Sequence, residues 1–268
     1  MKLKYSWIIF ILSLLFLVPA KIYITSNTGD FIIGHTANHP PQLAFVCAAL
    51  ALPIIIIILQ LIFGNTSSTI NVEKNIFCGI FAGISGILMI LSSIFDFVNN
   101  LGKFDLKSFF LTLTLLLSGI VFLIFANLHI TGNNFFIKTP LLSLLPTIWA
   151  GTRLVFLFLK HSVVVEGTVD MFDIFSSIFL MLFFFTQSKL LSSINGKKLV
   201  SKLFAYGLSS VIMLLLYNIP ALLKMNSNKD FSIMYITDIA LSIYIVSLLI
   251  SLTTSLKDNY KTNSGKHF

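Results

Sequence analysis

Charged residues are scarce in this sequence of 268 residues: lysine, arginine, aspartate and glutamate together make up only 10% of it. A soluble domain of this size has roughly a quarter of its residues charged, because its surface must be held in water. Hydrophobic residues make up 56%, and no segment is polar enough to form a soluble domain. The composition therefore excludes an ordinary soluble protein and predicts one polytopic domain, residues 1–268, in a lipid bilayer.

Cysteine is even rarer, with only Cys47 and Cys78 in the chain. The two residues fall toward opposite faces of the membrane in the helices predicted below, so a disulfide between them is excluded by distance. Both are expected to be core residues, because a free cysteine behaves as a small hydrophobic side chain.

Long apolar runs are the dominant feature of the chain. Each of the eight runs is close to the roughly 20 residues that a helix needs to cross a hydrocarbon core about 30 Å thick. A β-barrel is excluded, because its strands would alternate in hydrophobicity over about ten residues. We predict an all-α integral membrane protein with about eight transmembrane helices. They are Tyr5–Ile24, Ala44–Phe63, Ile76–Val98, Phe109–Ile130, Pro140–Leu159, Met171–Leu190, Leu199–Leu223 and Phe231–Leu256.

The lysines indicate how these helices are oriented. With a cytoplasmic N-terminus, eleven lysines lie on the inner side, including Lys2 and Lys4, and six lie on the outer side, including Lys21. Because basic residues are enriched on the cytoplasmic side, we expect both termini in the cytoplasm and the protein in the plasma membrane. The first helix also resembles a secretory signal with a small-residue site at Val18-Pro19-Ala20, so seven helices after cleavage is the alternative.

The links between the predicted helices leave no room for a soluble catalytic or DNA-binding module. The longest, Ser26–Gln42, has 17 residues. No phosphate-binding loop, dinucleotide motif or CxxC pair occurs. The net charge of +8 reflects the lysines that set the topology, and it favours attraction to anionic lipid. We expect no nucleic-acid partner.

Two short motifs resemble the GxSG and HxxG elements of rhomboid intramembrane serine proteases: Gly83–Gly86, which includes Ser85, and His129–Gly132. That family needs the serine hydroxyl within hydrogen-bond reach of the imidazole. Ser85 lies about 13 Å into its helix, whereas His129 lies at the end of the next one. We therefore expect no enzyme activity and interpret Gly79, Gly83 and Gly86 as a small-residue packing face.

His35 and His39 are four residues apart, the spacing of many metal sites on a helix. Gly34 precedes them and Pro40-Pro41 follow, which favours an exposed turn. We expect no metal ion and no cofactor.

The arginine and aspartate residues within the predicted helices fall in the outer half of the membrane. Arg153, the only arginine, lies about seven residues, or 10 Å, from the predicted outer end of its helix. An unpaired guanidinium there costs at least a few kcal/mol, so it should face the bundle and have an acidic partner. Asp238 lies at nearly the same depth, and Asp96 and Asp173 lie nearer the outer surface. We expect Arg153 to pair with Asp238 or with Asp173.

Polar and aromatic residues extend this group along the same helix faces. Trp149 lies one turn from Arg153, and Tyr235 shares a face with Asp238. Asn218 comes two residues before a proline that is expected to distort the outer third of its helix. The candidate ligand-binding residues are Asp96, Trp149, Arg153, Asp173, Tyr217, Asn218, Tyr235 and Asp238.

Three interpretations of this group remain open. The first is a polar, aromatic-lined cavity that opens to the outside, the second a static buried salt bridge between helices, and the third a proton or ion relay. A cavity predicts a small-molecule transporter or permease subunit. The alternative is a receptor-like or accessory membrane component that binds a ligand or a partner membrane protein without transport.

Two segments resemble a broad set of polytopic membrane proteins of low-GC bacteria. They are the opening segment, MKLK followed by LFLVPAKIY, and the segment from Trp149 through Arg153-Leu154 to Phe158. The frequent use of Lys, Asn, Ile and Phe agrees with such a genome. The resemblance implies a multi-pass fold and carries no activity with it.

Overall fold

The computed structural model describes residues 3–28, 40–64, 74–99, 106–133, 135–163, 171–194, 198–224 and 233–264. His35 and His39 lie outside the described residues. Eight α-helices and two short 3₁₀ helices make up nearly all of the described chain. The elements are α1 (Leu3–Thr28), α2 (Pro40–Phe63), α3 (Ile76–Asn99), α4 (Leu106–Thr131), η2 (Phe135–Ile137), η3 (Pro140–Leu144), α5 (Leu145–Val163), α6 (Met171–Leu191), α7 (Leu199–Lys224) and α8 (Ile233–Ser264).

The predicted all-α bundle of eight membrane-spanning helices is confirmed, because each of the eight is long and apolar enough to cross a membrane. Several helix ends differ from the predicted spans by up to four residues, and two differ by more. The fifth span begins with the 3₁₀ helix η3, since Pro146 lacks the N–H group that would donate to the carbonyl of Leu142 in a continuous α-helix. α8 continues to Ser264, past the predicted end at Leu256.

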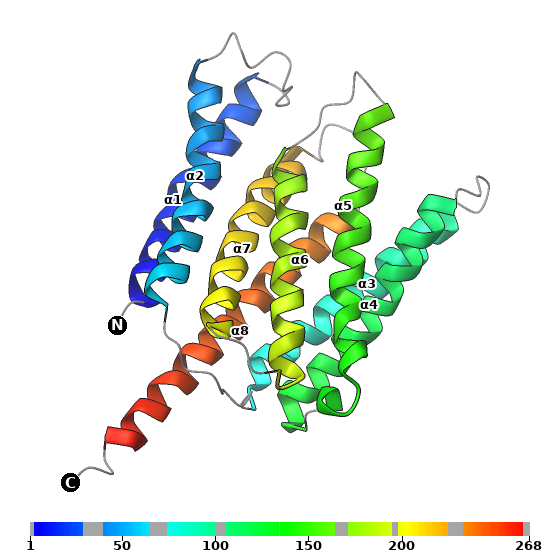
Figure 1. Cartoon of the computed structure of the whole chain (residues 1–268). Coiled ribbons are helices and arrows are strands. Elements are labelled where there is room, and N and C mark those ends of the chain that lie inside the picture. The colour runs from blue at the N-terminus through cyan, green and yellow to red at the C-terminus, as the bar shows by residue number, and fades with distance from the viewer. Residues whose placement is uncertain are drawn as a thin grey trace.

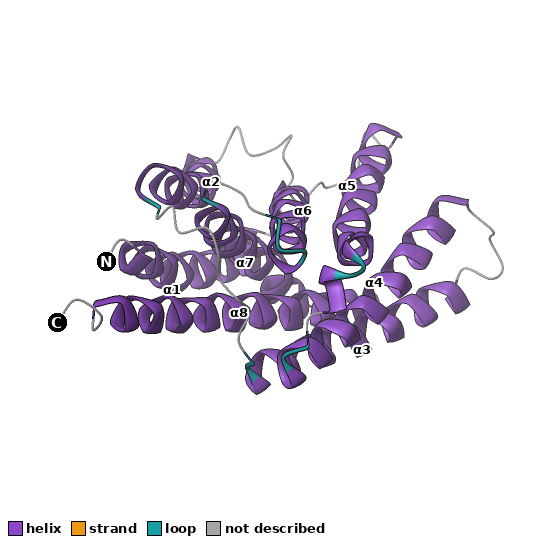
Figure 2. Cartoon of the chain, turned by 60° about the horizontal axis from the view of Figure 1, so that its bottom comes forward, coloured by secondary structure: helices purple, strands orange, loops and turns teal. Residues whose placement is uncertain are grey.

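The helices run alternately up and down, so that α1 begins and α8 ends at the same end of the bundle (Figure 1). We call this end the lower end, and the end where α5 stops and α6 starts the upper end. The α1–α2 pair and the α3–α4 pair lie on opposite sides of α7 and α8 (Figures 1 and 2). The predicted orientation makes the lower end cytoplasmic.

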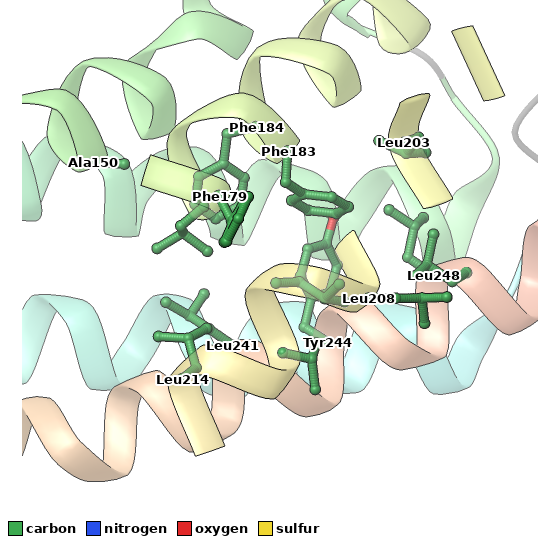
Figure 3. Close-up of a cluster of buried hydrophobic side chains, with 14 of the residues drawn as sticks. Ala150, Phe179, Phe183, Phe184, Leu203, Leu208, Leu214, Leu241, Tyr244 and Leu248 are labelled. Atoms are coloured by element: carbon green, nitrogen blue, oxygen red, sulfur yellow. The ribbon is translucent and has the colours of Figure 1, made fainter. Parts of the chain in front are cut away.

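α7 is the central helix of the bundle. It packs against α1, α2, α6 and α8, and most of its residues are buried. Its apolar side chains meet a cluster of aromatic rings from α6 and α8, including Phe183, Phe184 and Tyr244 (Figure 3). Phe122 of α4 joins the cluster edge-on to Phe184 and Tyr244, at centroid distances of 5.6 and 5.2 Å. Such edge-to-face pairs add to the burial of the rings themselves.

Glycines bring α3 and α4 into close contact, as the predicted small-residue face requires. A Cβ atom placed on Gly86 would lie 2.9 Å from the carbonyl oxygen of Gly119, whereas one on Gly79 would meet Ile130 at 2.6 Å. The same contacts fix the depths of the two protease-like motifs. Ser85 lies beside the middle of α4 and His129 beside the start of α3, about 9 Å apart along the helix axis.

We predict that Gly86→Ala destabilises the protein by about 1–3 kcal/mol, because the added methyl group has only a backbone carbonyl and packed side chains to displace. Thermal melting of the purified protein in detergent measures the change as a lower Tm.

Gly83→Ala is the matched control, one turn earlier on α3. Its Cβ would meet Ala126 at 3.6 Å, an ordinary contact, and alanine favours the helix. An equal loss of stability in both variants would show that the close approach at Gly86 is not what holds the two helices together.

Candidate functional site

Arg153 forms the centre of a charged cluster in the upper half of the bundle. Its side chain leaves α5 and is only 7% exposed. Nη1 donates to Oδ1 of Asp238 at 2.9 Å, and Nη2 donates to Oδ2 of the same carboxylate at 2.8 Å. Two parallel charge-assisted hydrogen bonds are the strongest geometry that these groups can adopt. α5 packs on α4 and α6, and α8 on α3 and α7, so the pair bridges two helices that are not close neighbours.

A second carboxylate binds the same guanidinium. Nη2 of Arg153 also donates to Oδ1 of Asp173, at 2.8 Å. Asp173 lies in the first turn of α6, where the helix dipole favours a negative charge. Its side chain is 13% exposed, whereas that of Asp238 is fully buried. Asp173 is therefore the more accessible of the two acidic groups.

Asn218 connects α7 to this cluster. Its Nδ2 donates to Oδ2 of Asp238 at 3.3 Å and to the carbonyl oxygen of Leu214 at 2.8 Å. Two residues later, Pro220 supplies no N–H to the carbonyl of Leu216. The amide oxygen of Asn218 is buried and has no hydrogen-bond partner. The cluster thus joins four helices and leaves one acceptor open.

Aromatic side chains surround the charges. The ring of Trp149 lies one turn from Arg153 on α5, with its centroid 6.0 Å from Cζ of the guanidinium. Trp149 is fully buried, and its Nε1–H has no hydrogen-bond partner. Tyr217 and Tyr235 pack edge to face at 6.0 Å, and Tyr217 interacts electrostatically with Arg153.

The structure brings together most of the residues that the sequence singled out. The sequence left open whether Arg153 pairs with Asp238 or Asp173, and the structure shows that it binds both. Asp96 is not one of its partners; it lies half-buried near the upper end of α3. On α3 below it, Ser85, Met89 and Ser92 are buried.

Lys21 is a charged residue whose position the sequence reasoning missed. It was assigned to the outer surface, but α1 continues past it to Thr28, and the side chain is only 3% exposed. Its Nζ lies 4.4 Å from the ring centroid of Phe172, the residue before Asp173. The sequence does contain a signal for this burial, because Lys21 lies three residues before the end of an apolar run at Ile24.

The cluster has an uneven set of charges and open polar atoms. Arg153, Asp173 and Asp238 carry one negative charge more than positive. Asp173 contacts the guanidinium through one oxygen, Oδ1. The amide oxygen of Asn218 and the indole N–H of Trp149 give the site one acceptor and one donor without a hydrogen-bond partner. Among the described residues, no group of three metal-ligating side chains occurs.

Comparison of the chain with protein-family models, with curated proteins and with solved structures finds no match.

We predict that Arg153→Gln lowers the free energy of unfolding by about 3–5 kcal/mol, because Asp238 would be left as a buried, uncompensated charge. Adding Asp238→Asn is expected to restore most of that loss. Thermal melting of the single and double variants in detergent forms the double-mutant cycle.

Asp173→Asn serves as the comparison, and its loss is expected to be smaller because its side chain is partly exposed. If Arg153→Gln is as stable as the wild type, the ion pair contributes nothing to the fold.

Proposed function

We propose that this protein is a small-molecule transporter, or the membrane-spanning subunit of a permease, with its substrate site at the Arg153 cluster. The observation that carries the proposal is a charged cluster inside the span with one carboxylate in excess and open polar atoms beside it. Intramembrane ionisable groups of this kind commonly mark substrate or ion pathways. We further infer that the upper end faces the outside of the plasma membrane.

The open groups favour a substrate that carries an amine. Asp173 and Asn218 offer acceptor oxygens, and an ammonium group supplies three donors. The positive charge of an amine balances the excess carboxylate, whereas an anion would add to it. Trp149 places an aromatic face and an N–H donor at the same site, which suits a cation that also carries an acceptor.

Asp173 is the group through which a substrate can enter. Asp238 holds the guanidinium by two hydrogen bonds and is fully buried, so its geometry is fixed by the bundle. Asp173 makes one contact with Arg153 and lies in the first turn of α6, nearest the upper end. We infer that it exchanges its contact with Arg153 for a contact with the substrate, while the Arg153–Asp238 pair holds the helices in place.

We propose no catalytic reaction for this chain. The nearest approach to a nucleophile and base, Ser85 and His129, lies on two helices at depths about 9 Å apart. Arg153, Asp173 and Asp238 are engaged with one another, which suits binding better than acid–base chemistry.

Uptake into liposomes that contain only this chain tests the proposal. We expect saturable uptake of at least one radiolabelled amine, putrescine or free lysine, and no uptake of citrate. Asp173→Asn is expected to reduce amine uptake by about tenfold, the effect of losing one charge-assisted contact.

Ser176→Ala is the matched control, because the Ser176 hydroxyl donates to the backbone carbonyl of Asp173 and leaves its carboxylate untouched. Uptake no greater than in protein-free liposomes contradicts the proposal. If a stoichiometric membrane partner then co-purifies with the chain, the receptor-like or accessory function is favoured instead.

A further inference from the structure

A second group of buried polar side chains lies in the lower half of the bundle, away from the Arg153 cluster. It consists of His129 on α4, Gln187 on α6 and Tyr244 on α8, each no more than 1% exposed. His129 lies two residues before the end of α4, and Gln187 four residues before the end of α6. We call these three residues the lower polar site.

Tyr244 lies next to each of the other two side chains. Gln187 donates a hydrogen bond from Nε2 to the phenol oxygen of Tyr244. Figure 3 shows the Tyr244 side chain pointing from α8 toward Phe183 and Phe184 on α6. The ring centroids of His129 and Tyr244 are 6.2 Å apart. At this separation one water molecule can join a polar atom of each ring.

The hydrogen-bond inventory of the lower polar site is incomplete. Nε2 of His129 and Oε1 of Gln187 are both buried without a partner. The phenol oxygen of Tyr244 accepts from Gln187, so its own O–H is still available to donate. A buried polar atom without a partner lowers the stability of the fold by about 1–3 kcal/mol. Three such groups occur at this site: one acceptor, one donor and one imidazole nitrogen.

One water molecule has the hydrogen-bonding capacity that all three groups need. It can accept from the phenol O–H of Tyr244 and donate to Oε1 of Gln187, and its remaining hydrogen is available to Nε2 of His129. Three hydrogen bonds are the usual number for a buried water. An apolar ligand would leave every one of these atoms unpaired.

The surroundings favour water over an ion. From α3, Cys78 is the titratable side chain buried in this region, and it hydrogen-bonds to Ser247 of α8. The carboxylates described within the spans, Asp96, Asp173 and Asp238, all belong to the upper half, so the described part of the spans supplies no acidic ligand for an inorganic cation here. Apart from the imidazole of His129, the basic side chains described toward the lower end are those of Lys74, Lys138, Lys189, Lys198 and Lys202.

We propose that His129, Gln187 and Tyr244 bind an internal water molecule in exchange with the aqueous phase at the lower end, through which the His129 imidazole exchanges protons. The site is separate from the Arg153 cluster, and the proposal holds whether or not the chain transports an amine. If the lower end is cytoplasmic, this site connects a histidine inside the membrane with cytoplasmic water.

Nuclear magnetic resonance of the full chain in lipid nanodiscs, labelled with ¹⁵N at histidine, tests this proposal on the wild-type protein. His129 is assigned as the signal that disappears in His129→Gln. We expect magnetisation to pass from water to the His129 imidazole. A His129 signal that receives none overturns the proposal, and no substrate is needed for either result.

The double variant Gln187→Leu/Tyr244→Phe removes the other two polar groups of the site. It is expected to reduce the water transfer to His129 by about tenfold, the effect of losing a hydrogen bond to the bound water. Thr186→Val is the matched control on α6, because the Thr186 hydroxyl bonds within its own helix to Leu182. Unchanged transfer in the double variant also overturns the proposal.

Discussion

A guanidinium inside an apolar bundle has to be paired, and the upper half of this protein is arranged around that requirement. Removing one ion from water costs several kcal/mol, and only close, well-aligned hydrogen bonds recover it. Arg153 satisfies this condition with two bonds to Asp238 and one to Asp173. Because these residues come from α5, α8 and α6, the positions of three helices follow from one side chain, and Asn218 adds α7.

The two halves of the bundle hold their helices together in different ways. In the upper half, charged hydrogen bonds join helices across the interior. Toward the lower half, contact depends on close backbone approach at Gly79 and Gly86 and on packed aromatic rings. Small-residue packing and interhelical hydrogen bonds are both usual in membranes, where lipid is as apolar as the helix surfaces. The division concentrates the charge in one region, which is the region of the proposed substrate site.

Hydropathy predicted the eight helices because a span must be long and apolar whatever it packs against. Its boundaries failed where local chemistry decided the backbone, as at Pro146, whose missing N–H leaves a 3₁₀ turn at the start of the fifth span. Depth alone suggested the partners of Arg153, because acidic residues at the same level were few. Depth did not show that both carboxylates bind it, nor that Asp96 does not, since both results depend on which helices are neighbours.

Residues that belong to no recognisable motif were the hardest to assign to a site from the sequence. Gln187 and Tyr244 each lie in a long apolar run with no motif around them, and His129 drew attention only through a protease-like pattern. Their hydrogen bond and their unpaired atoms exist only once α4, α6 and α8 are packed. Lys21 was misplaced for a related reason: its burial depends on α6, which supplies the ring of Phe172 that covers it.

The sequence by itself determined that this chain is a multi-pass helical membrane protein and that the arginine and aspartate residues of its spans lie toward the same side of the bundle. These properties follow from the free energy of transfer of each segment into lipid, which depends on that segment alone. Only the tertiary structure decided that Arg153 holds two carboxylates, that Asp173 is the accessible one, and that a second polar site exists around Tyr244. Those properties depend on distances between side chains of different helices, and a few ångströms separate an ion pair from two isolated charges.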